Sequence, residues 1–320
     1  MPPAPGANGE DVLRLRGATT AVAAVALLAA ACGVSRSATH PEAGTVTPTA
    51  AAGATAMATP PSGGMRTSFG DGTWTVGAQI AAGTYQTDGG SACKWARTGA
   101  GGDQSVPITT VIVTGHAVAT ILPGDAAFVT KGCGTWAPLP SSGPQLASFG
   151  DGTWAAGVDV APGTYSTPGG DQCQWDRLRD FTGTELGESA SITVHASPDG
   201  HAVATITSTD AGFTSQGCGT WTVLPPTGPQ LTSFGNGIWA VGIDIAPGTY
   251  SSSPVARCSW VRASDFTGDP GAVLASSGSL LSTLEVKILS SDRSFATVGC
   301  GTWKSATTPP PTASSSPITL

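Results

Sequence analysis

Apolar and polar positions alternate in short runs through residues 67–303, with the two-residue period that is typical of β-strands. β-Branched residues fill these runs, as at 108–113, 117–121, 202–206 and 284–289. Glycine, proline, asparagine and aspartate separate the runs, and the region contains no convincing helical pattern. The pattern therefore predicts an all-β protein made of short strands.

The same pattern occurs three times along the chain. Each copy opens with Ser-Phe-Gly, and the phenylalanines Phe69, Phe149 and Phe234 are 80 and 85 residues apart. Each copy closes with Gly-Cys-Gly-Thr-Trp, and a fixed period of this kind indicates tandem modules. Roughly six to eight short strands per copy suit a small β-sandwich or jelly roll. We predict three such modules, here called units 1, 2 and 3, at residues 67–136, 147–221 and 232–303.

Turns and linkers can also be predicted from the sequence. An Asp-Gly or Asn-Gly pair near the start of each unit, at 71–72, 151–152 and 236–237, accepts positive φ and predicts a hairpin between short strands. The connectors at 137–147 and 222–232 contain several prolines, so we expect fairly stiff, extended linkers between the units.

Six of the seven cysteines occur as one pair per unit, at separations of 40, 45 and 42 residues. Because each unit should fold on its own, we predict three internal disulfides. Closing a loop of this length stabilises a unit by roughly 4 kcal/mol in the chain-entropy model. Disulfides form in an oxidising compartment, so the chain is expected to be exported. The predicted pairs are Cys93–Cys133, Cys173–Cys218 and Cys258–Cys300.

The N-terminal segment has the features of an export signal. Residues 18–31 carry no charge, and their length suits a signal-peptide core and is too short to span a bilayer. Residues 28–33 read Leu-Ala-Ala-Ala-Cys-Gly, which resembles a degenerate bacterial lipobox. We predict a signal peptide at 1–31 and lipidation of Cys32, which would anchor the protein to the outer face of the membrane. The alternative is an Ala-x-Ala cleavage site, an unmodified Cys32 and a secreted protein.

Composition limits the remaining segments and the partners. Residues 32–66 and 304–320 consist mainly of small and polar residues that cannot bury enough surface to fold, so we predict a disordered stalk and a disordered tail. The net charge is −7 and only 11% of the residues are charged. The chain therefore offers no basic face for nucleic acid.

Two sets of tryptophans recur in the units. Trp95, Trp175 and Trp260 stand two residues after a half-cystine, and we expect them to pack on the disulfide in the core. The second set follows the Asp-Gly or Asn-Gly turn and is either core or a platform on which a sugar ring could stack. These candidate ligand-stacking residues are Trp74, Trp154 and Trp239.

Histidines and acidic residues give little support for catalysis. His116 and His201 lie in near-identical segments, but unit 3 has Thr283 at that position, so we interpret them as surface residues of a strand. His195 has no counterpart in the other units.

The acidic residues Asp159 and Asp244 are replaced by Gln79 in unit 1, which argues against a repeated acid/base pair or metal site. The sequence contains no Gly-x-Ser-x-Gly elbow, zinc spacing or phosphate-binding loop. We therefore expect no metal, no cofactor and no enzymatic activity.

The repeated motifs are Gly-Asp-Gly-x-Trp, Val-Gly-x-Asp-Ile-x-Pro-Gly-Thr-Tyr, Cys-x-Trp and Gly-Cys-Gly-x-Trp. They resemble a repeat of secreted actinobacterial proteins that occurs in lipoproteins and in the extracellular parts of membrane-anchored proteins, including some serine/threonine kinases. Unit 1 departs from the pattern, with Gln79 and Ala82 in place of the aspartate and the proline. The resemblance implies a location and a type of module, and no established activity.

We therefore expect an exported cell-surface lipoprotein whose three units bind envelope material, either a cell-wall glycan or an envelope protein. Tethered copies of a weak site would gain avidity. The alternatives are a structural spacer or adhesion stalk without a defined ligand, and a hydrolase. Exposure of the candidate stacking tryptophans on all three units would favour binding, whereas their complete burial would favour the spacer.

Overall fold

The computed structural model describes residues 64–99, 107–183, 192–253, 257–280 and 283–306 of the chain. The predicted signal peptide, Cys32, most of the stalk and most of the tail lie outside these residues. The described parts consist of β-strands and one short 3-10 turn, η1 (Pro270–Ala272). None of their helical residues forms a segment long and apolar enough to cross a membrane.

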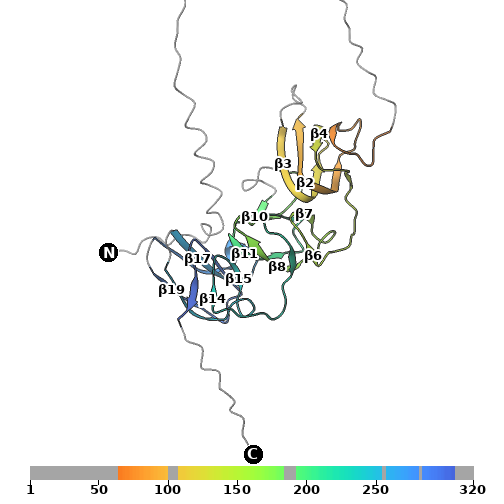
Figure 1. The fold of residues 1–320 in the computed structure, drawn as a ribbon. Helices are drawn as coiled ribbons and strands as arrows, with labels where there is room; N and C mark the ends of the chain where they lie inside the picture. Colours follow the sequence, from red (N-terminus) through yellow and green to blue (C-terminus); the bar gives the residue numbers. More distant parts are fainter. Residues whose placement is uncertain (1–63, 100–106, 184–191, 254–256, 281–282, 307–320) are drawn as a thin grey trace, which may run out of the picture.

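Unit 2 shows the plan of the repeat as two antiparallel sheets (Figure 1). Both sheets contribute side chains to one hydrophobic cluster, in which Trp175 and Phe213 meet Tyr165 and Trp221. The prediction of a small β-sandwich is therefore confirmed. In spatial order, the first sheet contains β7 (Gly152–Ala155), β12 (Gly212–Gln216), β9 (Gln174–Leu178) and β10 (Ile192–Ala196), and the second contains β6 (Ser148–Phe149), β13 (Trp221–Val223), β8 (Gly163–Gly170) and β11 (Gly200–Ile206).

Units 1 and 3 follow the same plan. In unit 1, two long strands, β2 (Gly83–Gly99) and β3 (Pro107–Ile121), serve both sheets, and β1 (Gly72–Thr75), β4 (Asp125–Lys131) and β5 (Ala137–Pro138) complete them. In unit 3 the first sheet contains β15 (Gly237–Ala240), β20 (Ser294–Val298), β17 (Arg257–Ala263) and β18 (Val273–Leu280). The second sheet contains β14 (Ser233–Phe234), β21 (Trp303–Ser305), β16 (Gly248–Ser252) and β19 (Leu284–Ile288), so the last strand runs two residues past the expected end of the unit.

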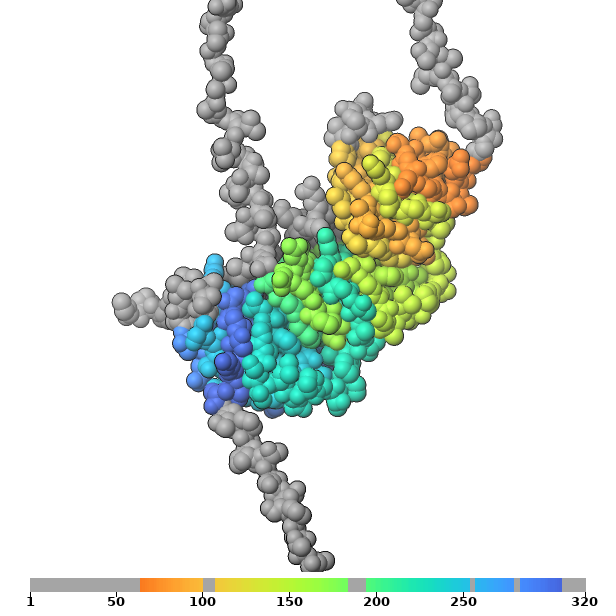
Figure 2. Space-filling model, in the orientation of Figure 1, coloured from red at the N-terminus to blue at the C-terminus, as the bar shows by residue number. Residues whose placement is uncertain are grey.

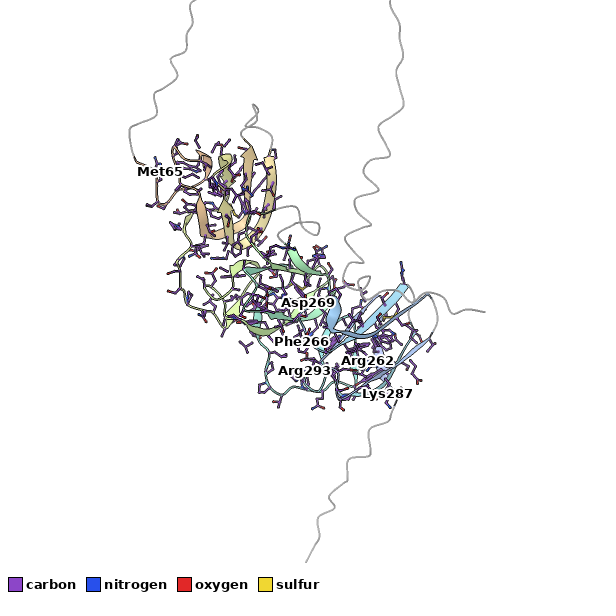
Figure 3. All side chains as sticks on the ribbon, turned by 180° about the vertical axis from the view of Figure 1, so that it is seen from behind. Met65, Arg262, Phe266, Asp269, Lys287 and Arg293 are labelled. Carbon is purple, nitrogen blue, oxygen red and sulfur yellow. A yellow bond between two sulfur atoms is a disulfide. The ribbon has the colours of Figure 1, made fainter. Side chains whose placement is uncertain are left out.

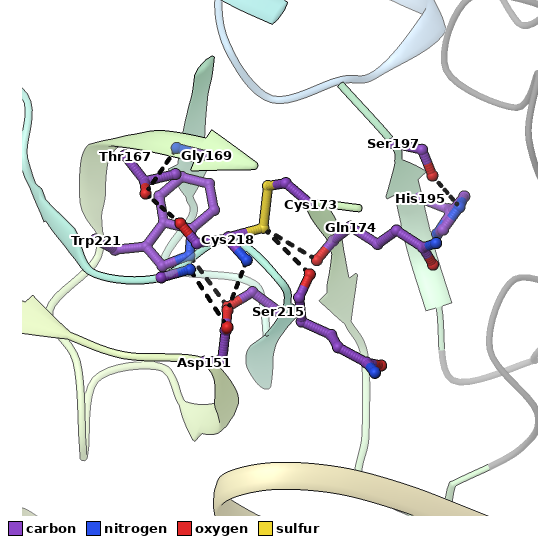
Figure 4. Close-up of a disulfide and its surroundings, with 12 residues drawn as sticks. Asp151, Thr167, Gly169, Cys173, Gln174, His195, Ser197, Ser215, Cys218 and Trp221 are labelled. Carbon is purple, nitrogen blue, oxygen red and sulfur yellow. Dashed lines mark hydrogen bonds between the residues drawn. A yellow bond between two sulfur atoms is a disulfide. The ribbon is translucent and has the colours of Figure 1, made fainter. Parts of the chain in front are cut away.

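Each unit contains one internal disulfide, as predicted. The bonds join Cys93 to Cys133, Cys173 to Cys218 and Cys258 to Cys300, each with a Cα–Cα distance of 4.3 Å. All six half-cystines are buried in the cores. Figure 4 shows the bond of unit 2, where the backbone N–H of Cys218 donates to Asp151 Oδ1 at 3.1 Å.

The expected hairpin at the Asp-Gly turn is wrong. In unit 2 the strands on either side of this turn, β6 and β7, belong to different sheets. The reason is that the side chain of Asp151 is committed to the closing loop, whose Cys218 and Gly219 N–H groups it accepts at 3.1 and 3.3 Å. The turn therefore crosses between the two layers of the sandwich.

The units dock directly on one another, in addition to being joined by the linkers. Strand β3 of unit 1 forms a parallel bridge to β7 of unit 2 at His116 and Gly152, and β11 bridges to β15 of unit 3 at His201 and Gly237. The second sheet of each unit thus continues into the first sheet of the next. The space-filling view shows this contact between successive units (Figure 2).

Candidate functional site

Each unit carries the same cluster of a tryptophan, an arginine and an aspartate, here called its docking site. In unit 1, Arg97 Nε and Nη2 donate to the two carboxylate oxygens of Asp125 at 2.7 and 2.8 Å. The carboxylate also accepts the N–H of Leu122 at 2.7 Å. The arginine comes from the Cys-x-Trp-x-Arg strand, and the aspartate is the first residue of β4. The pair thus joins two motifs that the sequence pattern alone did not connect.

A loop of unit 2 fills the docking site of unit 1. Arg97 Nη1 donates to the carbonyl oxygen of Thr182 at 2.8 Å, and the N–H of Thr120 donates to that of Phe181 at 2.8 Å. Gly183 has φ +64°, and a Cβ there would lie 2.3 Å from Trp95 Cη2, so this position requires glycine. With the loop in place, Trp95 is 3% exposed.

Unit 3 fills the docking site of unit 2 in the same way. Arg177 Nη1 donates to the carbonyl oxygen of Thr267 at 2.9 Å and to Asp269 Oδ2 at 3.2 Å. The N–H of Thr205 donates to the carbonyl oxygen of Phe266 at 3.0 Å. Burial lowers the pKa of Arg177, but the hydrogen bonds and charges of its acidic partners outweigh burial, and the net effect raises the pKa above its ordinary value. The guanidinium is therefore charged and fully engaged.

The inserted loop is shaped by its own aspartate. Asp265 Oδ1 accepts the N–H and the hydroxyl of Thr267 at 2.8 and 2.7 Å, and Asp180 holds Thr182 in the same way. Such a turn fixes the backbone before docking and points the threonine carbonyl outward. This loop lies outside the repeated motifs from which the units were predicted, although a shared tetrapeptide marks it in the sequence. The tetrapeptide Asp-Phe-Thr-Gly is identical in units 2 and 3 and absent from unit 1.

Histidines reinforce both junctions. His116 stacks on Trp154 with ring centroids 4.3 Å apart, and His201 stacks on Trp239 at the same distance. Each Nδ1 lies 2.7 or 2.8 Å from a backbone carbonyl oxygen of the next unit. A carbonyl only accepts, so Nδ1 carries the proton. The interpretation of these histidines as surface strand residues is therefore wrong. Unit 3 has Thr283 at the corresponding position, and no described residue of another unit packs on it there.

The candidate stacking tryptophans are half-buried in all three units. One ring face of Trp154 and of Trp239 is covered by the histidine of the preceding unit. Trp74 begins the array and has the guanidinium carbon of Arg66 5.2 Å from its ring centroid instead. The structure thus gives these rings contacts within the chain, and their stacking on a ligand stays a prediction.

The docking site of unit 3 has no loop in it among the described residues. Arg262 donates to Asp292 at 2.6 and 3.0 Å through Nε and Nη2, and within the described chain its Nη1 has no acceptor. The side chain of Arg262 is 17% exposed, compared with 6% and 5% for Arg97 and Arg177. The hydrogen bond to Asp292 raises the pKa of Arg262. Figure 3 labels Arg262 and Lys287 in this unit.

The other polar candidates have local roles. Asp159 accepts the N–H of Ala155 at 2.8 Å, and Asp244 accepts that of Ala240 at 2.9 Å. In unit 1 the side chain of Gln79 does the same for Thr75, at 2.9 Å. These residues close a turn in each unit, which explains why aspartate and glutamine are interchangeable there.

Unit 2 alone contains a chain of aspartate, histidine and serine. His195 Nδ1 lies 2.5 Å from Asp176 Oδ1. On the other side of the ring, Nε2 lies 3.2 Å from Ser197 Oγ, a contact that Figure 4 shows. This is the order of a hydrolase triad. However, Ser197 is only 8% exposed, and the pocket that it lines is about as small as a single water molecule. The Ser197 hydroxyl is therefore largely covered by the residues around it.

Comparison with family models gives one result. The model of the Rv1352-like extracellular domain matches residues 66–137, 147–222 and 232–304, that is, each of the three units. Comparison with curated proteins and with solved structures returned no match.

Proposed function

Because this chain belongs to the family of Rv1352-like extracellular domains, we propose that it is a surface protein that works as a rigid spacer outside the cell. The observation that supports the proposal is the docking of successive units through a shared sheet, an inserted loop and a stacked ring pair. Contacts of this kind restrict the motion that tandem domains on linkers otherwise have.

The linkers add to this rigidity. Each linker begins as a strand or a strand extension. The N–H of Leu139 donates a hydrogen bond to the carbonyl oxygen of Thr84, and that of Leu224 to the carbonyl oxygen of Thr164, both at 2.9 Å. Each then runs along the next unit, where Leu146 and Leu231 form bridges to Val160 and Ile245. Backbone hydrogen bonds and bridges thus attach each connector to a unit at both of its ends, although most of its side chains are exposed.

Attachment of the spacer is part of the proposal. Lipidation of Cys32 would fix the N-terminal end of the chain to the membrane, so that unit 3 would be the most distant from the cell. Binding of a cell-wall glycan by the tryptophans is a separate prediction, and the stacked histidines reduce the ring area that a sugar could use.

Residual dipolar couplings of the full chain test the spacer directly. A rigid array gives couplings from all three units that fit a single alignment tensor. Gly183→Ala should disturb the junction of units 1 and 2, because the added methyl group collides with Trp95, and should require separate tensors. Gly157→Ala is the matched control, since φ is +76° and no atom lies within 4 Å of its added Cβ. A wild-type chain that needs three tensors contradicts the proposal.

A further inference from the structure

The docking site of unit 3 retains the parts that hold a loop in units 1 and 2. Trp260 and Arg262 occupy the positions of Trp175 and Arg177, and Asp292 pairs with Arg262 as Asp210 pairs with Arg177. Trp260 is partly exposed, whereas Trp175 is 1% exposed beneath its loop. The site is therefore formed, and no described residue covers it.

The donors that the site offers are those that the filled sites use. In units 1 and 2 the site provides two hydrogen-bond donors, an arginine Nη1 and a backbone N–H. They donate to the carbonyl oxygens of two successive loop residues. The pairing of Thr249 with Lys287 in unit 3 matches that of Thr164 with Thr205 in unit 2, so the second donor would be the N–H of Lys287. Lys287 is exposed and places a positive charge at the strand position where units 1 and 2 have threonine.

Charge indicates which loop would fit. The filled site of unit 2 takes Thr267-Gly268-Asp269, and Asp269 forms an ion pair with Arg177 at 3.2 Å. A site with an additional lysine favours a loop that carries such a carboxylate. We propose that the docking site of unit 3 binds a Thr-Gly-Asp turn of a partner protein, held by Trp260, Arg262 and Lys287.

The chain itself does not supply this turn. Thr-Gly-Asp occurs once in the sequence, at 267–269, where it already serves the junction of units 2 and 3, and residues 306–320 contain neither glycine nor aspartate. Docking of a complete repeat, as in a second copy, would bury exposed Glu285 and Lys287 against the incoming sheet, at positions where unit 2 has Val203 and Thr205. Burial of unpaired charge opposes such a contact.

The test is a titration of the full-length chain with a cyclic peptide, Ser-Asp-Phe-Thr-Gly-Asp, that reproduces residues 264–269. The readout is the NMR signal of the Trp260 indole N–H, assigned with the variant Trp260→Phe. We expect a saturable shift of this signal. Replacing the last aspartate of the peptide by asparagine should weaken binding about tenfold, because a charge-assisted hydrogen bond is lost.

Arg262→Lys keeps the charge beside Asp292 but removes the planar fork, and should also weaken binding about tenfold. The control variant Arg66→Lys lies directly before unit 1, over Trp74, and should bind the peptide as the wild type does. The absence of a saturable shift, or equal affinity for the aspartate and asparagine peptides, overturns the proposal. Both results are obtained with the wild-type chain, so they do not depend on whether a variant folds. Self-association of the chain in sedimentation that Arg262→Lys abolishes would also overturn it, because the occupant would then be a second copy.

The inference goes beyond the proposed spacer function and can fail separately. If one alignment tensor fits all three units but the peptide does not bind, the spacer proposal stands and the partner proposal is wrong. If the peptide binds but the units require three independent tensors, the binding site is supported and the spacer proposal is wrong.

Discussion

The docking sites of units 2 and 3 have the same residues in the same arrangement but different surroundings. Around Arg177 the next unit supplies two acceptors, and the side chain is 5% exposed. Around Arg262 no described residue of another unit supplies an acceptor, and the side chain is 17% exposed. The comparison shows that a repeated site acquires its role from its place in the array.

The two ends of the array are specialised accordingly. Val118 and Val203, which face the following unit, are buried, whereas the corresponding Glu285 of unit 3 is exposed. At the other end, unit 1 lacks the Asp-Phe-Thr-Gly loop that would need a preceding unit. Terminal repeats with polar outer faces keep stacked repeats from growing further. The outer faces of units 1 and 3 therefore differ from the faces that join the units.

The largest expected difference between the two sites follows truncation of their tryptophans. Trp175→Ala should lower the free energy of unfolding by about 3–5 kcal/mol, since it empties a closed core site. Trp260→Ala should cost less, because solvent already reaches that ring. Urea denaturation followed by circular dichroism measures both, and equal losses would show that the next unit does not cover Trp175.

An intermediate effect is expected when the loop of unit 3 can no longer enter the docking site of unit 2. Gly268→Ala places a methyl group 2.6 Å from Val194 Cγ1, and such overpacking should cost about 1–3 kcal/mol and open the junction. The measurement is hydrogen exchange at the N–H of Thr205, which should lose protection while the N–H of Lys287 does not change. Gly242→Ala, with φ +80° and open space around it, is the matched control. Unchanged protection at Thr205 would contradict the docking.

A smaller effect is expected from the stacked histidine. His201→Ala removes a ring pair and a hydrogen bond, and should lower the free energy of unfolding by about 1–2 kcal/mol. Thr283→Ala, at the corresponding position of unit 3, should change it by less than about 0.5 kcal/mol. Both values come from the same urea experiment, and a loss at Thr283 as large as that at His201 would argue against a junction role for the histidine.

In contrast to the docking sites, the three units should respond alike to alkaline solution. Burial raises the pKa of Tyr85, Tyr165 and Tyr250 above the ordinary value of 10.0. A phenol with a raised folded-state pKa stabilises the fold below pH 10, and this contribution is lost as the pH rises through the folded-state pKa. All three units should therefore lose stability together above pH 10, monitored by phenolate absorbance and circular dichroism. Titration of the phenols at the ordinary value, without unfolding, would contradict this expectation.

Much of the fold could be predicted from the chain alone. The two-residue period of apolar side chains indicated strands such as β11 and β19, and the repeat placed one disulfide in each unit. These predictions succeed because strand formation and a cysteine pair within one repeat depend on local pattern and spacing. The prediction of a hairpin at Asp-Gly was wrong because the side chain of Asp151 accepts a hydrogen bond from Cys218, 67 residues away.

The sequence by itself thus determined the three sandwiches and their cross-links. Only the tertiary structure decided that Arg97 reaches Thr182, 85 residues along the chain, and that His116 covers Trp154. The physical reason is that periodicity tells which side of a strand is buried but not which other segment covers it. The covering segment is fixed by shape and hydrogen bonding between folded units, and these exist only once each unit has formed.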